Sequence, residues 1–162
     1  YTQDFTANIF DDQNNPVAGE DLTLYVKDSK VGDAAQTTAY LEANYKIGMF
    51  NFDLGYRYVD NLYADYSINN SDFLEPDNRG ALKLPSFGLV DLGATINFPF
   101  IGNTSSFRVN VNNVFNTLYI AESNTNLHLE NDTDPNWNGI NDENFVWFGF
   151  GTTWNATLRI RF

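Results

Sequence analysis

The strongest constraint on this chain is an alternation of apolar and polar residues near its C-terminal end. From Trp154 to Phe162 the even-numbered positions hold Trp, Ala, Leu, Ile and Phe, and the odd-numbered positions hold Asn, Thr, Arg and Arg. Successive side chains of a β-strand point to opposite faces. The stretch therefore predicts a strand with one apolar face and one charged face.

Four further stretches alternate in the same way, at about residues 38–47, 50–58, 90–98 and 107–112. The charged residues of the five stretches all fall on the polar side: Glu42, Lys46, Asp53, Arg57, Asp91, Arg108, Arg159 and Arg161. A soluble antiparallel sandwich alternates too, with its apolar side packed against a second sheet. The alternation thus predicts an all-β chain but does not decide what covers the apolar side.

The lengths of the connections favour a membrane barrel over a sandwich. Short turns are expected at Gly48-Met49 and at 99–104, and long polar loops at about 11–33, 61–86 and 116–146. Loops longer than ~15 residues are uncommon in compact soluble domains. Outer-membrane barrels carry short turns at one end and long loops at the other, and each strand needs ~9–11 residues to cross. A short strand at Leu22–Val26 and the end of a strand at 1–10 are further expectations.

Five to seven strands are fewer than the ~8 of the smallest closed barrels. An open sheet edge in lipid would leave backbone N–H and C=O groups without partners, at several kcal/mol each. We therefore predict a transmembrane antiparallel β-barrel of which residues 1–162 supply the C-terminal strands. The chain opens at Tyr1 without a secretory signal, and we expect it to begin inside a longer protein.

Composition narrows the function classes. The mean hydropathy is −0.37, and no apolar run approaches the ~18 residues that a spanning helix requires. The chain has no cysteine, so it offers neither disulfides nor thiolate metal ligands. A net charge of −12 argues against nucleic acid as a partner, and most of the acidic residues lie in the long loops, as expected of a solvated surface.

Three segments together resemble the C-terminal part of TonB-dependent outer-membrane receptors of the Bacteroidetes type. Residues 107–120 (FRVNVNNVFNTLYI) resemble the V-x-N-L-F-(N/D)-x-x-Y signature of that family, and residues 84–93 (LPSFGLVDLG) resemble its L-P-x-Y-x-x-x-D entry into a late strand. Residues 148–162 are similar to its G-x-G-R-x-W-x-x-x-x-R-x-x-F close, although Thr152 or Thr153 stands where Arg is common. Residues 32–38 and 56–65 are also similar, so the resemblance covers about residues 30–162.

The resemblance implies an active-transport receptor in the bacterial outer membrane, with a barrel of about 22 strands around a plug domain. Its partners would be outer-membrane lipid, the rest of its own barrel, the plug and, through the missing N-terminal part, the TonB complex. This chain would contribute wall, outer loops and the closing strand of a nutrient importer, without enzymatic activity or a cofactor. The transported solute, a surface lipoprotein partner and the oligomeric state stay open.

Two other architectures stay open on the sequence. One is a soluble or surface β-sandwich binding module whose acidic loops hold a ligand. The other is a smaller closed barrel or adhesin without a plug. Neither nucleic acid nor a catalytic site belongs to any of the three interpretations, since no nucleophile motif surrounds a serine.

Residues Asp134–Glu143 partly follow a calcium-loop pattern, with oxygen ligands at alternate positions followed by Gly139. The twelfth position is Phe145 instead of a bidentate Glu, and Pro135 and Trp137 are bulky. We expect an ordinary Asn/Asp-rich outer loop, with calcium as the alternative. A lone His128 without cysteines gives no transition-metal cluster, so we predict no metal site and place His128 in a loop.

The remaining candidates lie on the inward face and in the loops. The charges Glu42, Asp53, Arg57, Asp91, Arg108, Arg159 and Arg161 could line a substrate path, but cross-strand pairing and contact with the plug are the preferred interpretation. Loop aromatics could stack on a ligand, although packing of the loops on each other is preferred: Tyr63, Tyr66, Phe73 and Trp137. We expect Trp154 to be an interfacial anchor.

Overall fold

The computed structural model of the chain describes residues 3–66, 71–100, 103–130 and 136–161. These residues form an all-β structure with one short 3-10 turn. They divide into two compact units, each assembled from three stretches of chain. The first unit comprises Tyr1–Ala34, Leu62–Leu84 and Glu122–Trp147, and the second comprises Ala35–Asn61, Pro85–Ala121 and Phe148–Phe162.

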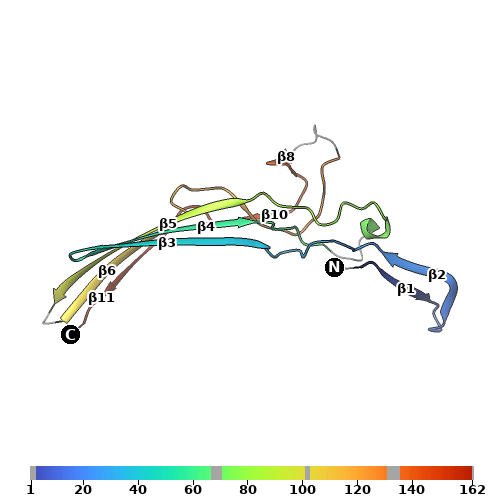
Figure 1. Cartoon of the computed structure of the whole chain (residues 1–162), viewed down its shortest axis with the longest axis horizontal. Helices are drawn as coiled ribbons and strands as arrows, with labels where there is room; N and C mark the ends of the chain where they lie inside the picture. Colours follow the sequence, from blue (N-terminus) through green and yellow to red (C-terminus); the bar gives the residue numbers. More distant parts are fainter. Residues whose placement is uncertain (1–2, 67–70, 101–102, 131–135, 162) are drawn as a thin grey trace. The chain divides into compact units, whose positions relative to one another are not determined.

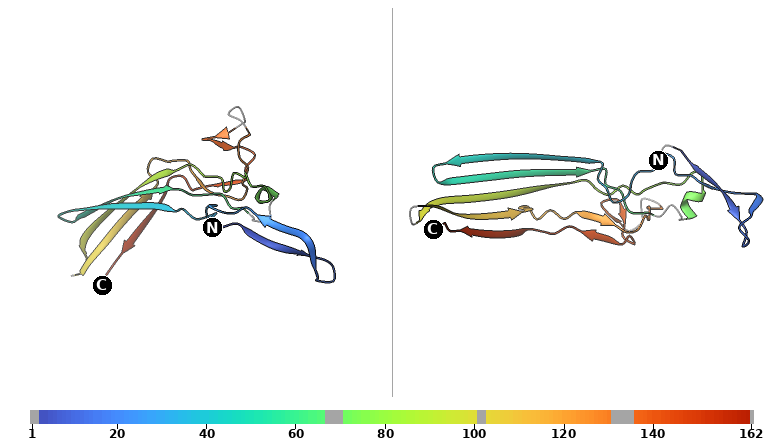
Figure 2. Two further views of the ribbon diagram at one scale, coloured as in Figure 1. Left: turned by 45° about the vertical axis from the view of Figure 1, so that its right-hand side comes forward. Right: turned by 90° about the horizontal axis from the view of Figure 1, so that it is seen from below.

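The second unit is built on a five-stranded antiparallel sheet in the order β11-β6-β5-β4-β3. Its strands are β3 (Thr37–Ile47), β4 (Phe50–Asp60), β5 (Phe87–Phe100), β6 (Asn103–Asn112) and β11 (Thr153–Arg159). The five lie side by side in that order and twist together (Figures 1 and 2). All five predicted strands are confirmed, and no described sheet closes on itself.

The strand ends differ from prediction in two places. The predicted turn at 99–104 is shorter, because Pro99 pairs with Thr104 and Phe100 with Asn103 in the β5–β6 ladder. Strand β11 ends at Arg159, and Phe162, which was expected to close the strand, lies outside the described residues. The predicted turn between β3 and β4 is confirmed, and Gly48 adopts a φ of 55°, which glycine tolerates without steric cost.

Strand register carries the alternation across the whole sheet. Tyr45 pairs with Phe52, which pairs with Ala94, which pairs with Val109, which pairs with Ala156. The neighbouring row on the same face is Ala43, Leu54, Leu92, Val111 and Trp154. Because a slip of one residue would turn every side chain of a strand to the other face, this matched register gives the sheet one apolar and one polar face.

The first unit contains structure where the sequence predicted long loops. Residues 11–33 hold β2 (Pro16–Leu24), which pairs with β1 (Phe5–Phe10) in a hairpin of its own, so the short strand expected at Leu22–Val26 is longer and lies earlier. Within 61–86 lie the 3-10 turn η1 (Ser71–Leu74) and a bridge between Tyr63 and Lys83. Within the predicted loops, the sequence indicated only the short strand at Leu22–Val26, because short, irregular strands leave little periodic signal.

The third predicted loop, 116–146, is also structured. It holds β7 (Ile120–Ser123), β8 (Asn136–Trp137) and β9 (Ile140–Asn141), and β10 (Val146–Phe148) begins at its end. Strand β7 pairs with β10, and β8 pairs with β9. No helix of the described residues is long and apolar enough to cross a membrane.

A small core stabilises the first unit. Leu24, Val26 and Phe73 are buried together, with Phe73 only 1% exposed, and Tyr66 packs against them. The rings of Tyr66 and Phe73 have centroids 5.0 Å apart, and the Tyr66 hydroxyl donates to the Lys30 carbonyl at 2.6 Å. The preferred interpretation of these two aromatics, that they pack the loops, is confirmed.

In the second unit, Asn113 joins the ends of three strands. Its backbone N–H donates to Asp91 Oδ1 at 2.9 Å, and its Oδ1 accepts the Thr117 N–H at 2.8 Å. Its Nδ2 donates to the carbonyls of Thr117 and Phe150, at 2.9 and 3.2 Å. The residue is 3% exposed and adopts a φ of 49°, which Asn tolerates better than most residues. This geometry explains why an Asn stands here.

We predict that Asn113→Ala lowers the free energy of unfolding of the intact protein by about 2–4 kcal/mol, because buried partners lose their hydrogen bonds. Asn113→Gly is the matched control for backbone strain: it accepts the positive φ but makes none of the side-chain hydrogen bonds, so it should be destabilised slightly less. Denaturant unfolding measures both. A loss below about 1 kcal/mol for the alanine variant would contradict this role.

Candidate functional site

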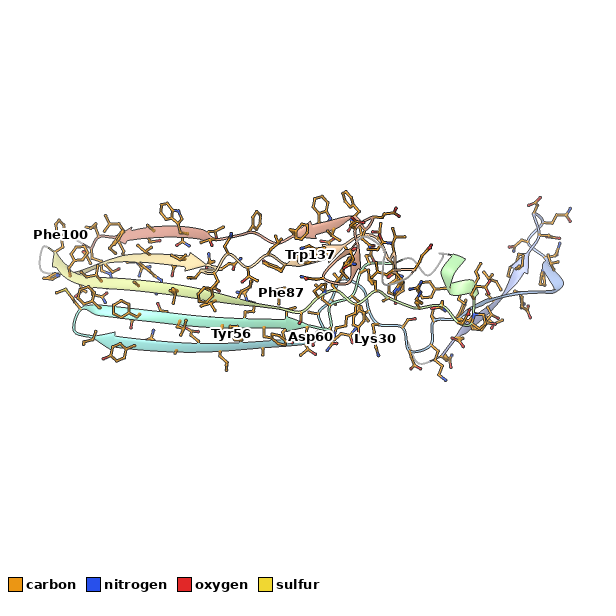
Figure 3. All side chains as sticks on the ribbon, turned by 90° about the horizontal axis from the view of Figure 1, so that it is seen from above. Lys30, Tyr56, Asp60, Phe87, Phe100 and Trp137 are labelled. Carbon is orange, nitrogen blue, oxygen red and sulfur yellow. The ribbon has the colours of Figure 1, made fainter. Side chains whose placement is uncertain are left out.

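Within the described residues, the apolar face of the five-stranded sheet is uncovered. Eleven of its large side chains are between 41% and 72% exposed: Leu41, Tyr45, Ile47, Phe50, Phe52, Leu54, Tyr56, Leu92, Phe107, Trp154 and Leu158. Side chains project from the sheet along all five strands, as Figure 3 shows around the labelled Tyr56. A continuous exposed apolar surface of this kind marks contact with a membrane or another protein.

Both lateral edges of the sheet are open. Within the described residues β3 pairs only with β4, and β11 pairs only with β6. Each edge therefore presents backbone N–H and C=O groups that further strands can pair. Strand β3 is 11 residues long, whereas soluble proteins commonly keep unpaired edge strands short.

The polar face carries seven of the eight predicted charges, and the strand register places them all on one side. The structure brings two pairs of them together. Arg108 Nη1 lies 2.8 Å from Asp53 Oδ2, and Arg57 Nη2 lies 3.8 Å from Asp91 Oδ2. Glu42, Lys46 and Arg159 form no salt bridge with described residues, and Arg161 lies beyond β11.

A glycine makes room for the Asp53–Arg108 pair, which spans from β4 to β6 across β5. A Cβ at Gly93 would lie 2.8 Å from Asp53 Oδ2 and 2.9 Å from Arg108 Nη2. Asp53 also accepts from Asn44 Nδ2, and Arg108 Nε donates to Asn110 Oδ1 at 2.8 Å. The preferred interpretation of these charges as cross-strand pairs is confirmed for Asp53 with Arg108 and for Arg57 with Asp91.

We predict that Arg108→Gln destabilises the intact protein by about 1–3 kcal/mol, because it leaves the half-buried Asp53 carboxylate without its cation. The added change Asp53→Asn should recover part of that loss. A double-mutant cycle from denaturant unfolding measures the coupling. Strictly additive effects would show that the two side chains do not interact.

The first unit contains a polar hollow of about 610 Å³. Its lining residues are Glu75, Asp77, Asn78, Arg79, Gly80, Asn126, Leu127, His128, Glu130, Asn141, Asp142 and Glu143. Five of these carry carboxylates, so the hollow suits a polar or cationic solute better than an apolar one. No motif in the sequence points to this site, because its residues come from separated loops that share no spacing.

Hydrogen bonds fix the wall of this hollow around Gly80. The Gly80 carbonyl accepts from Asn126 Nδ2 at 2.8 Å and from His128 Nε2 at 3.1 Å. Arg79 Nη1 donates to the Leu129 carbonyl at 2.5 Å. His128 lies in a loop, as predicted, and its ring holds the Gly80 carbonyl in place through this hydrogen bond. None of the four loop aromatics that were considered as ligand platforms lines the hollow.

The described part of the possible calcium loop forms a β-hairpin. Asn136 pairs with Asn141 and Trp137 with Ile140, around a turn in which Asn138 and Gly139 both have positive φ. Asp134 and Pro135 lie outside the described residues. Among the residues that the structure describes, no three His, Asp or Glu side chains gather closely enough to hold a metal ion.

The carboxylate of Asp33, in the first unit, is affected by two others. Partial burial raises the pKa of Asp33, and the negative charges of Asp65 and Glu122 raise it further. Asp33 adopts a φ of 53°. A raised folded pKa means that Asp33 costs stability as pH rises above the ordinary aspartate value of ~4, and that this cost is absent below that value.

We predict that Asp33→Asn raises the thermal midpoint at neutral pH, and that the gain disappears below about pH 4. Asn tolerates the same positive φ, so the backbone is unchanged. Asp28→Asn, at another position of positive φ, controls for the exchange itself. A gain that does not change with pH would contradict the electrostatic origin.

No family model matches the chain, and neither curated proteins nor solved structures give a match.

Proposed function

We propose that this chain is part of the wall of an outer-membrane β-barrel, the C-terminal part of a TonB-dependent receptor that imports a nutrient. The apolar face of the five-stranded sheet would meet lipid, and the polar face would meet the interior. The first unit, built from the long connections, would form outer structure in which a solute is first bound. The chain itself would carry out no chemistry.

The uncovered apolar face is the observation that carries the proposal. In a sandwich the same side chains would be buried against a second sheet about 10 Å away. Here Trp154 is 72% and Leu41 is 70% exposed, and the apolar rows run across all five strands. A membrane barrel requires this arrangement, with apolar residues outside and polar ones inside.

Two further observations support it. The open edges at β3 and β11 allow the sheet to continue into further strands, as closure of a barrel demands. The residues that carry the family resemblance also form coherent local structure. Asp91 from one motif binds Asn113 from another, and Asn116 Oδ1 accepts the Thr152 N–H at 3.1 Å, next to β11.

Placing a charge on either face tests the proposal. Leu54→Arg, on the apolar face, should lower the free energy of unfolding of the intact protein in bilayers by about 2–4 kcal/mol, because a guanidinium would face hydrocarbon. Asn155→Arg is the matched control: it lies on the polar face, in the row next to that of Leu54. We expect a loss of about 1 kcal/mol or less for it, because it gives up the hydrogen bond from Asn110 Nδ2 to Asn155 Oδ1 but stays in a polar environment.

Denaturant titration of the protein refolded into lipid vesicles measures both variants. The intact wild-type protein should be extracted from cell membranes only by detergent. A wild-type protein recovered in the soluble fraction, with Leu54→Arg tolerated as well as Asn155→Arg, would contradict the proposed function.

A further inference from the structure

The polar face of the sheet has a hollow of about 560 Å³ that differs from the rest of this acidic chain. Its lining residues are Lys46, Asn51, Thr95, Asn97, Ser106, Arg108, Thr157 and Arg159. Three of the chain's nine basic residues line it, and none of its 21 acidic residues does. The other lining side chains are amides and hydroxyls, which can donate hydrogen bonds.

Four of these residues form a square on two neighbouring strands. Arg108 on β6 pairs with Thr157 on β11, and Ser106 on β6 pairs with Arg159 on β11. The two arginines thus stand at one diagonal of the square, and the two hydroxyls stand at the other. Diagonal positions on one face of an antiparallel pair are ~7–8 Å apart, within reach of two long side chains.

The charges in this square are incompletely balanced. Arg108 lies beside Asp53, but no described carboxylate forms a salt bridge with Arg159 or with Lys46 across the hollow. Like charges close together on one face of a sheet repel each other, and an anion between the two arginines would relieve that repulsion. Guanidinium groups bind the oxygen atoms of phosphate and carboxylate through paired hydrogen bonds, and the two hydroxyls can donate to the same group.

We propose that this hollow is an oxyanion-binding site, in which Arg108 and Arg159 hold a phosphate or carboxylate group with help from Ser106 and Thr157. Lys46 raises the positive potential from the opposite side of the hollow. The anion comes either from a free phosphate-bearing solute or from a carboxylate elsewhere in the intact protein. The inference uses only the polar face, so it does not require that the apolar face meet lipid.

Thermal unfolding of the intact protein tests this, with sodium phosphate compared with sodium chloride at equal ionic strength. Phosphate should raise the midpoint saturably in the wild type, and Arg159→Gln should weaken the apparent affinity at least tenfold. Arg57→Gln is the matched control, since it removes an arginine of the same face outside the hollow, and it should keep the response. Arg159→Lys, which keeps the charge, should retain part of it.

The two sources of the anion give different results. If a carboxylate of the protein already fills the site, phosphate has no effect, Arg159→Gln lowers the midpoint, and carbodiimide coupling followed by mass spectrometry joins Lys46 to an acidic residue. If no anion binds, phosphate has no effect and Arg159→Gln leaves the midpoint unchanged or raises it, because a repelling charge is removed. That last result would overturn the proposal.

Membrane extraction of Arg159→Gln should match the wild type, which separates this test from that of the proposed function.

Discussion

The matched register of five strands is the constraint on which the rest of the structure depends. In the middle of the sheet, apolar residues pair with apolar residues on the next strand, from Ile47 with Phe50 at one edge to Phe107 with Leu158 at the other. A single slip would bring Arg108 or Asp53 to the apolar side. Register therefore separates an apolar face from a polar face.

On the polar face, the same register organises charge. Gly93 leaves the space through which Arg108 reaches Asp53 across an intervening strand, so a residue without a side chain determines where an ion pair can form. The charges nearer the β3–β4 turn are different, because Lys46 and Arg159 line a hollow without an acidic residue in its wall. One face thus combines internally paired charges, which stabilise the sheet, with a basic region suited to an anion from outside it.

Much of the sheet was predictable from sequence, since a period of two survives over seven or more residues in β3, β4, β5 and β11 and the charges mark the polar side. The hydrogen bonds of Asn113 were not predictable, because they join segments that lie 22 and 37 residues apart in the sequence. This holds although Asn113 lies in a motif with a family resemblance. The first unit was predicted least well. Its strands are as short as two residues, and its polar hollow draws side chains from three regions of the chain that share no spacing.

The central claim is that the apolar side of the sheet meets lipid, and a spin-label scan of β4 tests it most directly. The chain has no cysteine, so single cysteines can be introduced at positions 51 to 58 of the intact protein and labelled in bilayers. The account predicts that labels at even positions are accessible to oxygen dissolved in lipid and labels at odd positions to a water-soluble nickel complex, with a period of two. Even-numbered labels that neither reagent reaches would contradict it, because they would place a second protein layer on the apolar face.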